Sequence, residues 1–196
     1  MNKRKKLYCV CGMTASGKDS LVNNLVNDYP DKLKTICSYT TRPKRDNETE
    51  GKEHYFVSKV EFNQLMKANP DNILAYTKIC SEENPDGYEY MALDNELETA
   101  NVYIIDPKGI KYLKEKYSDR YNIVVIYIHA KYEQRRERAR LSRSDFEKEF
   151  DKRVESENEQ FETFIKNREY DYIVFNSDGS YSDALFMLGI LLDVIE

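Results

Sequence analysis

The fold is decided by Gly12-Met13-Thr14-Ala15-Ser16-Gly17-Lys18-Asp19, a short stretch near the amino end. An apolar run at 7–11 precedes it, and the helical spacing of Leu21, Val22 and Leu25 follows it. In the order strand, glycine loop, helix, the pattern G-x-x-x-x-G-K lets successive backbone N–H groups turn toward one anion. The helix N-terminus and the ammonium group of Lys18 add positive charge at the same place. The stretch therefore predicts a cradle for the phosphates of a nucleotide.

The alternative is a glycine-containing turn with an incidental lysine. The agreement of strand, helix and lysine argues against that interpretation. We expect the loop and the first helical residues to bind a nucleoside triphosphate. The predicted set is Gly12, Thr14, Ala15, Ser16, Gly17, Lys18, Asp19 and Ser20.

Asp19 occupies the position at which this motif usually has a serine or threonine that ligates Mg²⁺, and Ser20 follows it. A carboxylate is also a hard-oxygen ligand for Mg²⁺. Its negative charge beside a polyphosphate is tolerable only with a metal bound directly or through water, so we predict Asp19 as the metal-site residue. The alternative is that Asp19 only stabilises the positive end of the helix dipole.

Length and composition limit the possible classes of protein. A chain of 196 residues is one globular domain by size, and the formal net charge of −5 argues against nucleic acid as a partner. Cys9 and Cys11 lie two apart in an apolar run, which indicates buried thiols in a reducing compartment, and zinc-ligand spacing is absent. No apolar run approaches the ~18 residues of a membrane span, and no cleavage site follows the basic start. We therefore expect a cytoplasmic protein with no membrane partner, either a monomer or a homodimer.

The remaining pattern predicts an α/β fold with a central parallel sheet and an inserted lobe of short strands. We expect strands at 33–37, 54–57, 73–79, 88–91, 102–106, 122–128 and 171–175. We expect helices at 59–68, 94–100, from Pro107, at 133–143, 145–167 and 181–195.

A basic loop follows the second predicted strand and contains Arg42, Lys44 and Arg45, with Pro43 preventing regular structure. Arginine suits phosphate because its planar guanidinium donates two parallel hydrogen bonds. A solvated loop is the alternative, and the phosphate cradle in the same chain favours a second phosphate site.

Two further features carry charge near strand ends. Asp106 ends an apolar strand, where it can organise metal-bound water or accept from a substrate hydroxyl, or simply cap the helix that begins at Pro107. The segment 133–143 is rich in arginine; Arg136 and Arg140 share one helix face and Arg135 and Arg138 another. Pairing with nearby glutamates is the alternative for most of them.

Taken together, the chain resembles the guanylate kinase family of nucleoside monophosphate kinases over nearly its whole length. The most specific segment is Ser38-Tyr39-Thr40-Thr41-Arg42 with Arg45, Glu48, Gly51 and Phe56, which is similar to the family's S-x-T-T-R-x-x-R-x-x-E-x-x-G signature. Tyr170-Asp171-Tyr172 through Asn176 resembles the Y-D-Y-x-x-x-N segment beside the ATP base.

The resemblance implies roles for individual residues. Acceptor binding is implied for Ser38, Arg42, Arg45, Tyr90, Asp106 and either His54 or Tyr55, of which spacing favours the first and side-chain chemistry the second. ATP binding extends to Arg136 and Asn176, and the implied catalytic residues are Lys18, Arg45, Arg140 and Arg153. The implied parts are a P-loop NTPase core (1–37, 101–132 and 154–196), an acceptor-binding lobe (38–93) and a helical lid (133–153).

The sequence departs from the family at the base-reading positions. The guanine-reading carboxylate corresponds to Ala75 and its partner serine to Ala92, and Glu89 is a possible substitute. The loop variant Gly-Lys-Asp-Ser-Leu and the pair Glu53-His54 also resemble ribose bisphosphate phosphokinases. The main hypothesis is ATP-dependent phosphorylation of a nucleoside monophosphate, GMP or dGMP first, with Mg²⁺. The alternatives are another monophosphate, ribose bisphosphate, or a non-catalytic module that binds phosphopeptides.

Overall fold

The structure is a computed structural model that describes residues 4–45, 48–52, 54–79, 84–142, 146–177 and 179–195. These residues form two compact units. The first unit is Met1–Lys34 with Asn101–Glu196, and the second unit is Thr35–Ala100. Glu53, Cys80 and residues 143–145 of the predicted lid lie outside the described residues.

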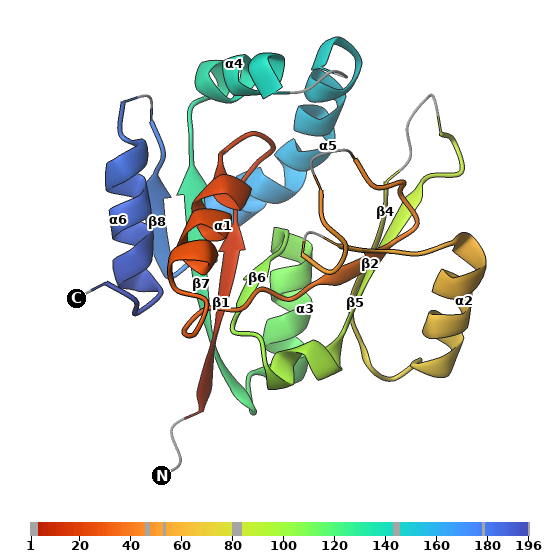
Figure 1. Ribbon diagram of the computed structural model, residues 1–196. Coiled ribbons are helices and arrows are strands. Elements are labelled where there is room, and N and C mark those ends of the chain that lie inside the picture. The colour runs from red at the N-terminus through yellow and green to blue at the C-terminus, as the bar shows by residue number, and fades with distance from the viewer. Residues whose placement is uncertain are drawn as a thin grey trace. The chain divides into compact units, whose positions relative to one another are not determined.

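The first unit is built on a parallel sheet of four strands in the order β6-β1-β7-β8. The strands are β1 (Lys5–Cys11), β6 (Val102–Ile104), β7 (Tyr121–His129) and β8 (Tyr172–Phe175). All three pairings are parallel, and in register Tyr8 lies opposite both Val102 and Val124. Because parallel strands end at the same edge, the loops after β1, β6, β7 and β8 are neighbours. The predicted α/β class with a central parallel sheet is confirmed (Figure 1).

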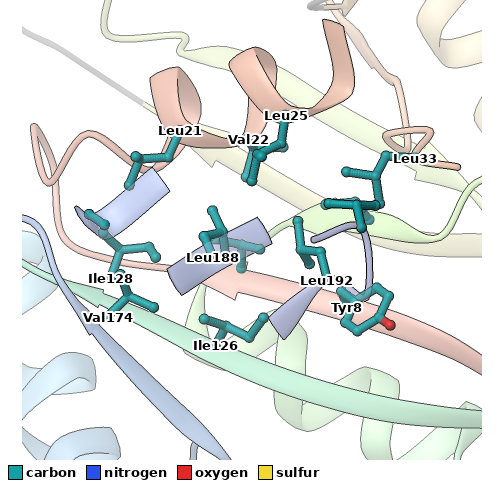
Figure 2. Packing of buried hydrophobic residues seen from close by; sticks show 14 residues of the cluster. Tyr8, Leu21, Val22, Leu25, Leu33, Ile126, Ile128, Val174, Leu188 and Leu192 are labelled. Atoms are coloured by element: carbon teal, nitrogen blue, oxygen red, sulfur yellow. The ribbon is translucent and has the colours of Figure 1, made fainter. Parts of the chain in front are cut away.

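Helices cover both faces of this sheet. They are α1 (Lys18–Asp28), α3 (Pro107–Tyr117), α5 (Phe146–Lys166) and α6 (Tyr181–Leu191). Helix α4 (Tyr132–Ser142) packs against α5. On one face the apolar sides of α1 and α6 pack on the strands. Leu21 and Leu25 of α1 and Leu188 of α6 belong to this cluster, as Figure 2 shows. On the other face the ring of Tyr127 contacts the rings of Phe161 and Phe164 of α5.

The alternation of side chains along β1 explains why Cys9 and Cys11 are both buried on the same face of the sheet. Tyr8 and Val10 belong to the apolar core beside α1 and α6, so Cys9 and Cys11 point to the opposite face. Both thiols are free and buried. Burial raises the pKa of the Cys11 thiol to about 12, so the thiol stays protonated and behaves as a small apolar group.

The second unit has its own four-stranded sheet in the order β3-β2-β5-β4. Its strands are β2 (Ser38–Thr40), β3 (His54–Phe56), β4 (Ile73–Ile79) and β5 (Tyr88–Leu93). β2 and β3 are parallel and the other pairs antiparallel. Helix α2 (Lys59–Ala68) begins with a capping box of Ser58 and Glu61 and buries Phe62 against Met91 and Leu93. A 3₁₀ turn, η1 (Asp94–Glu98), ends the unit.

Two predicted elements, the strand at 33–37 and the last helix, differ instructively from the structure. The strand expected at 33–37 is an irregular connection with a single bridge at Thr35, and the regular strand begins at Ser38. Leu33, Ile36 and Cys37 are nevertheless buried. Their apolar pattern therefore indicated burial and not strand structure. The last helix ends at Leu191 because Asp193 takes a left-handed conformation (φ 59°) and the Val194 N–H turns back to the carbonyl of Gly189.

Within the described residues, no helix combines the length and the apolar character that crossing a membrane requires.

Candidate active site

The loop between β1 and α1 has the backbone of an anion cradle. Gly12 leaves no room for a side chain, because a Cβ there would lie 2.7 Å from the carbonyl oxygen of Ile128. Ala15 and Gly17 both have positive φ, at 58° and 85°. Alternation of ordinary and left-handed residues turns successive N–H groups to one side, which makes a concavity for anions. We call residues 12–19 the phosphate loop.

Two side chains hold the second half of the phosphate loop. The carbonyl oxygen of Ser16 accepts a hydrogen bond from Asn176 Nδ2 (2.8 Å) and one from Arg138 (3.3 Å). Arg138 also donates to the carbonyl oxygen of Asn176 (2.8 Å). A Cβ on Gly17 would lie 2.3 Å from Asn176 Nδ2, so only glycine permits this approach. The predicted loop residues and Asn176 therefore lie together.

A surface hollow of about 300 Å³ lies beside this group. Its lining includes Gly17, Ser20, Arg138, Asn176 and Tyr181. The Oδ1 atom of Asn176 is buried and has no hydrogen-bond partner among the described residues. The hollow is large enough for one heterocyclic base next to the phosphate loop.

The two charged residues at the start of α1 are neighbours that differ in exposure, with Lys18 partly buried and Asp19 accessible. Lys18 Nζ lies 3.2 Å from Asp19 Oδ2, and the Asp19 side chain is 65% exposed. Its hard oxygens fit a divalent cation, but no group of three or more acidic, His or Cys side chains that could hold a metal occurs in the described part of the chain. A cation there would need phosphate oxygens or water to complete its coordination.

Asp106 acts as a helix cap. Its carboxylate accepts a hydrogen bond from the Gly109 N–H (2.7 Å) at the start of α3, as the simpler of the two interpretations predicted. The residue remains exposed at the edge where the parallel strands end, so the cap does not exclude a contact with substrate.

The arginines of α4 divide into inward and outward groups. Arg135 is buried, and Arg138 reaches the phosphate loop. Arg136, for which the family resemblance implies ATP binding, is exposed, and Arg140 forms a bidentate pair with Glu137 (2.7 and 2.8 Å). The sequence signal for Arg138 was its spacing of three from Arg135, which puts both on one helix face. Arg153 of α5 is partly buried.

In the second unit, strand register gathers a set of polar side chains. Ser38 pairs with His54 across β2 and β3, and Thr40 pairs with Tyr90 across β2 and β5, so Ser38, His54 and Tyr90 share a face. Ser38 Oγ lies 2.8 Å from His54 Nδ1, and the rings of His54 and Tyr90 lie 5.5 Å apart. We call this surface the acceptor face.

The basic loop joins the same group through Arg42. Burial alone would lower the pKa of Arg42, but hydrogen bonds to Glu48 and Tyr90 raise it overall. Glu48 receives two bonds from the guanidinium (2.7 and 3.0 Å) and one from the Arg45 N–H (2.8 Å). Glu48 therefore fixes the loop, a role that the sequence did not reveal. The Arg45 residue is exposed.

Two other residues, Tyr55 and Glu89, are placed by the same alternation. Tyr55 lies on the opposite face and stacks near Tyr39 (4.9 Å), so the structure does not bring it to Ser38 and Tyr90. Glu89 also lies on that opposite face, where it accepts from Tyr76 (2.8 Å) and pairs with Lys59 of α2.

Ala75 and Ala92 are paired in register and share the acceptor face with Tyr90. Because Glu89 faces α2, it cannot replace a carboxylate at Ala75.

Comparisons with known proteins agree on one family. The guanylate kinase family profile matches residues 4–184. A guanylate kinase of Thermotoga maritima is 31% identical over 190 residues, covering 93% of this chain and 84% of that protein. One of Blochmanniella floridana is 31% identical over 176 residues, covering 88% and 79%. The crystal structure of guanylate kinase from Anaplasma phagocytophilum has a TM-score of 0.64 at 22% identity, covers 98% of this chain and 87% of that one, and so shares the fold. From the family profile and these relatives, we conclude that this chain belongs to the guanylate kinase family.

Proposed function

We propose that this chain transfers the γ-phosphoryl group of ATP to GMP, with dGMP as a second acceptor. The observation that carries the proposal is the phosphate loop, in which two left-handed residues turn main-chain N–H groups inward directly ahead of Lys18. Such a loop serves a polyphosphate, and a module that only binds a phosphopeptide has no use for it. Family membership supports the same reaction.

The donor belongs to the first unit in this proposal. The phosphate loop and Lys18 bind the triphosphate, and the hollow beside Asn176 and Arg138 receives the adenine base or its ribose. Asp19 and Ser20, both exposed at the start of α1, would contact Mg²⁺ directly or through water. When bound, Mg²⁺ would neutralise part of the charge on the β- and γ-phosphates.

The acceptor belongs to the second unit. Ser38, Arg42, His54 and Tyr90 form one group of donors and aromatic edges suited to a monophosphate. Arg45 is exposed at the edge of this group.

Phosphoryl transfer needs little covalent chemistry from the protein. Charge spreads over three phosphoryl oxygens in the transition state, and catalysis consists of positioning and charge stabilisation. We assign that stabilisation to Lys18, Arg45, Arg140 and Arg153. Arg140 and Arg153 belong to segment 133–153, the proposed lid, whose closure would exclude water and so limit hydrolysis of ATP.

A coupled assay for nucleoside diphosphate formation tests the proposal. ATP and Mg²⁺ are supplied with GMP, dGMP, AMP, CMP, UMP or ribose bisphosphate in turn, and GMP is expected to give the highest kcat/KM. Chelation of Mg²⁺ by EDTA should abolish turnover. Lys18→Met should lower kcat by about 10²- to 10³-fold, because it removes a charge that stabilises the transferred group. Turnover with ribose bisphosphate alone, or ATP binding with no turnover of any acceptor, would contradict the proposal.

A further inference from the structure

The backbone N–H and the carbonyl oxygen of Thr14, in the phosphate loop, are both hydrogen-bonded to charged side chains. Its N–H donates to Glu157 Oε2 (2.7 Å), and its carbonyl oxygen accepts from the Arg135 guanidinium (3.2 Å). Thr14 is 3% exposed and Arg135 is 5% exposed. Arg135 comes from α4 and Glu157 from α5, so two helices remote in sequence hold one residue of the phosphate loop.

This grip determines the direction of the next N–H group. In a trans peptide the C=O and the following N–H point in opposite directions. Arg135 draws the Thr14 carbonyl toward α4, and the Ala15 N–H is therefore turned away from α4. Asn176 and Arg138 do the same to the Ser16 carbonyl and thus to the Gly17 N–H. The two clamped carbonyls directly precede the two residues with positive φ.

Ala15 is the residue that most needs such support. A residue with a Cβ at φ 58° is strained, whereas glycine adopts this conformation freely. The side chain of Ala15 packs with Met13 against Ala139, Phe150 and Val154 of α4 and α5. The same two helices thus hold the backbone and the side chain of the strained residue.

Burial of Arg135 is costly for a role in packing alone. Its Nε–H is buried with no partner among the described residues. Burial lowers the pKa of Arg135, and Glu157 provides the largest opposing effect. An apolar side chain would fill this position on α4 without such a cost. The hydrogen bond to the Thr14 carbonyl oxygen therefore explains why a charged side chain occupies this position.

We propose that Arg135 and Glu157 are positioning residues for the nucleotide donor: they clamp Thr14 so that the Ala15 N–H points into the anion cradle. The inference rests on the proposed function in that the phosphate loop binds ATP. Neither residue touches the phosphates; both act through the backbone of the phosphate loop.

The test compares Arg135→Met and Glu157→Gln with wild type and with Glu155→Gln. Glu155 is an exposed residue on the same helix and serves as the matched control. Isothermal titration with the non-hydrolysable analogue adenylyl imidodiphosphate and Mg²⁺ gives the Kd, and steady-state kinetics give the KM for ATP and for GMP. We expect Arg135→Met to weaken analogue binding about tenfold, the loss of one charge-assisted hydrogen bond, and Glu157→Gln to weaken it about threefold. The KM for GMP should not change, and Glu155→Gln should match wild type.

Rescue by Ala15→Gly separates positioning from general stability. Because glycine adopts the left-handed conformation freely, Ala15→Gly combined with Arg135→Met should recover at least about threefold of the lost affinity. Where Arg135→Met does not fold, Glu157→Gln with and without Ala15→Gly provides the same comparison.

An unchanged Kd in the clamp variants, an equal rise of both KM values, or no rescue by glycine would overturn the inference while wild-type turnover left the proposed function standing. Absence of analogue binding and turnover in wild type would instead overturn both.

Discussion

The phosphate loop and the acceptor face, which we propose as the two phosphate sites, are built in opposite ways. The phosphate loop presents main-chain N–H groups from consecutive residues, shaped by left-handed conformations at Ala15 and Gly17. The acceptor face presents side chains from three strands and a loop, namely Ser38, His54, Tyr90 and Arg42. The first depends on backbone conformation, and the second depends on strand register.

This difference predicts opposite sensitivities. In the phosphate loop a single added carbon can abolish the conformation, whereas many side chains could be exchanged without changing the direction of an N–H group. On the acceptor face each side chain would itself contact the acceptor, and residues one position away point to the other face. The predictions below test this contrast.

Gly17→Ala should produce the largest effect. The new Cβ would lie 2.3 Å from Asn176 Nδ2 at a φ of 85°, so the residue must move and take the Lys18 N–H with it. We expect analogue binding to weaken about 30- to 100-fold. Gly51→Ala is the matched control, because its φ is 74°, the new carbon would lie 3.3 Å from Tyr55 Cε1, and the residue belongs to the second unit rather than to the hollow beside the phosphate loop. Equal losses in the two variants would show that strain alone, and not the approach of Asn176, governs the phosphate loop.

His54→Ala and Tyr55→Phe test the acceptor face with neighbouring residues. His54 lies beside Ser38 and Tyr90, while Tyr55 stacks near Tyr39 on the other face. Loss of one hydrogen bond to a charged phosphate should raise the KM for GMP about tenfold in His54→Ala. Tyr55→Phe should stay within about twofold, since its ring is retained. Steady-state kinetics at saturating ATP measure both, and the reverse order would contradict the assigned faces.

These two regions also differ in how far the sequence predicted them. The whole phosphate loop was predictable because Gly12, Gly17 and Lys18 lie in one continuous motif between a strand and a helix. The choice between His54 and Tyr55 was not, because it depends on which of the two side chains shares a face with Ser38. The register that decides this is set by contacts far apart in the chain.

Helix phase caused the remaining difficulty. The sequence located the arginine-rich helix, but which of its arginines face the phosphate loop depends on the rotation of α4 about its axis. The structure sets that rotation through the buried residues Arg135 and Ala139, and Arg138 faces inward as a result. Glu157 gave no local signal at all, because its partner Thr14 lies 143 residues away.

Glu48→Gln should have a smaller and pH-dependent effect. Burial would raise the pKa of Glu48, but hydrogen bonds from Arg42 and the Arg45 N–H lower it below its ordinary value of 4.5. A lowered pKa means that Glu48 stabilises the fold above that value and loses its contribution as the pH falls through the folded-state pKa. At pH 7 we expect a loss of about 1 kcal/mol in unfolding free energy and about a fivefold rise in the KM for GMP.

Urea unfolding at pH 7 and again near pH 4 measures the unfolding free energy of wild type and of Glu48→Gln. The difference between wild type and Glu48→Gln should shrink at the lower pH. A difference that stays constant across this range would exclude ionised Glu48 as the group that organises the loop.

Ala75→Glu should produce the smallest change, in selectivity rather than rate. Ala75 and Ala92 face the same side as Tyr90, and Glu89 is bonded to Tyr76 and Lys59 on the other side. The acceptor face therefore has no carboxylate at the position where the family resemblance puts the guanine reader. Because Ala75 is partly exposed, a new carboxylate there exchanges hydrogen bonds with water for hydrogen bonds with the base. We expect the ratio of kcat/KM for GMP to that for AMP to rise about threefold, with Ala68→Glu on exposed α2 unchanged. An unchanged ratio in Ala75→Glu would mean that the base is recognised elsewhere, and the acceptor face would then account for the phosphate alone.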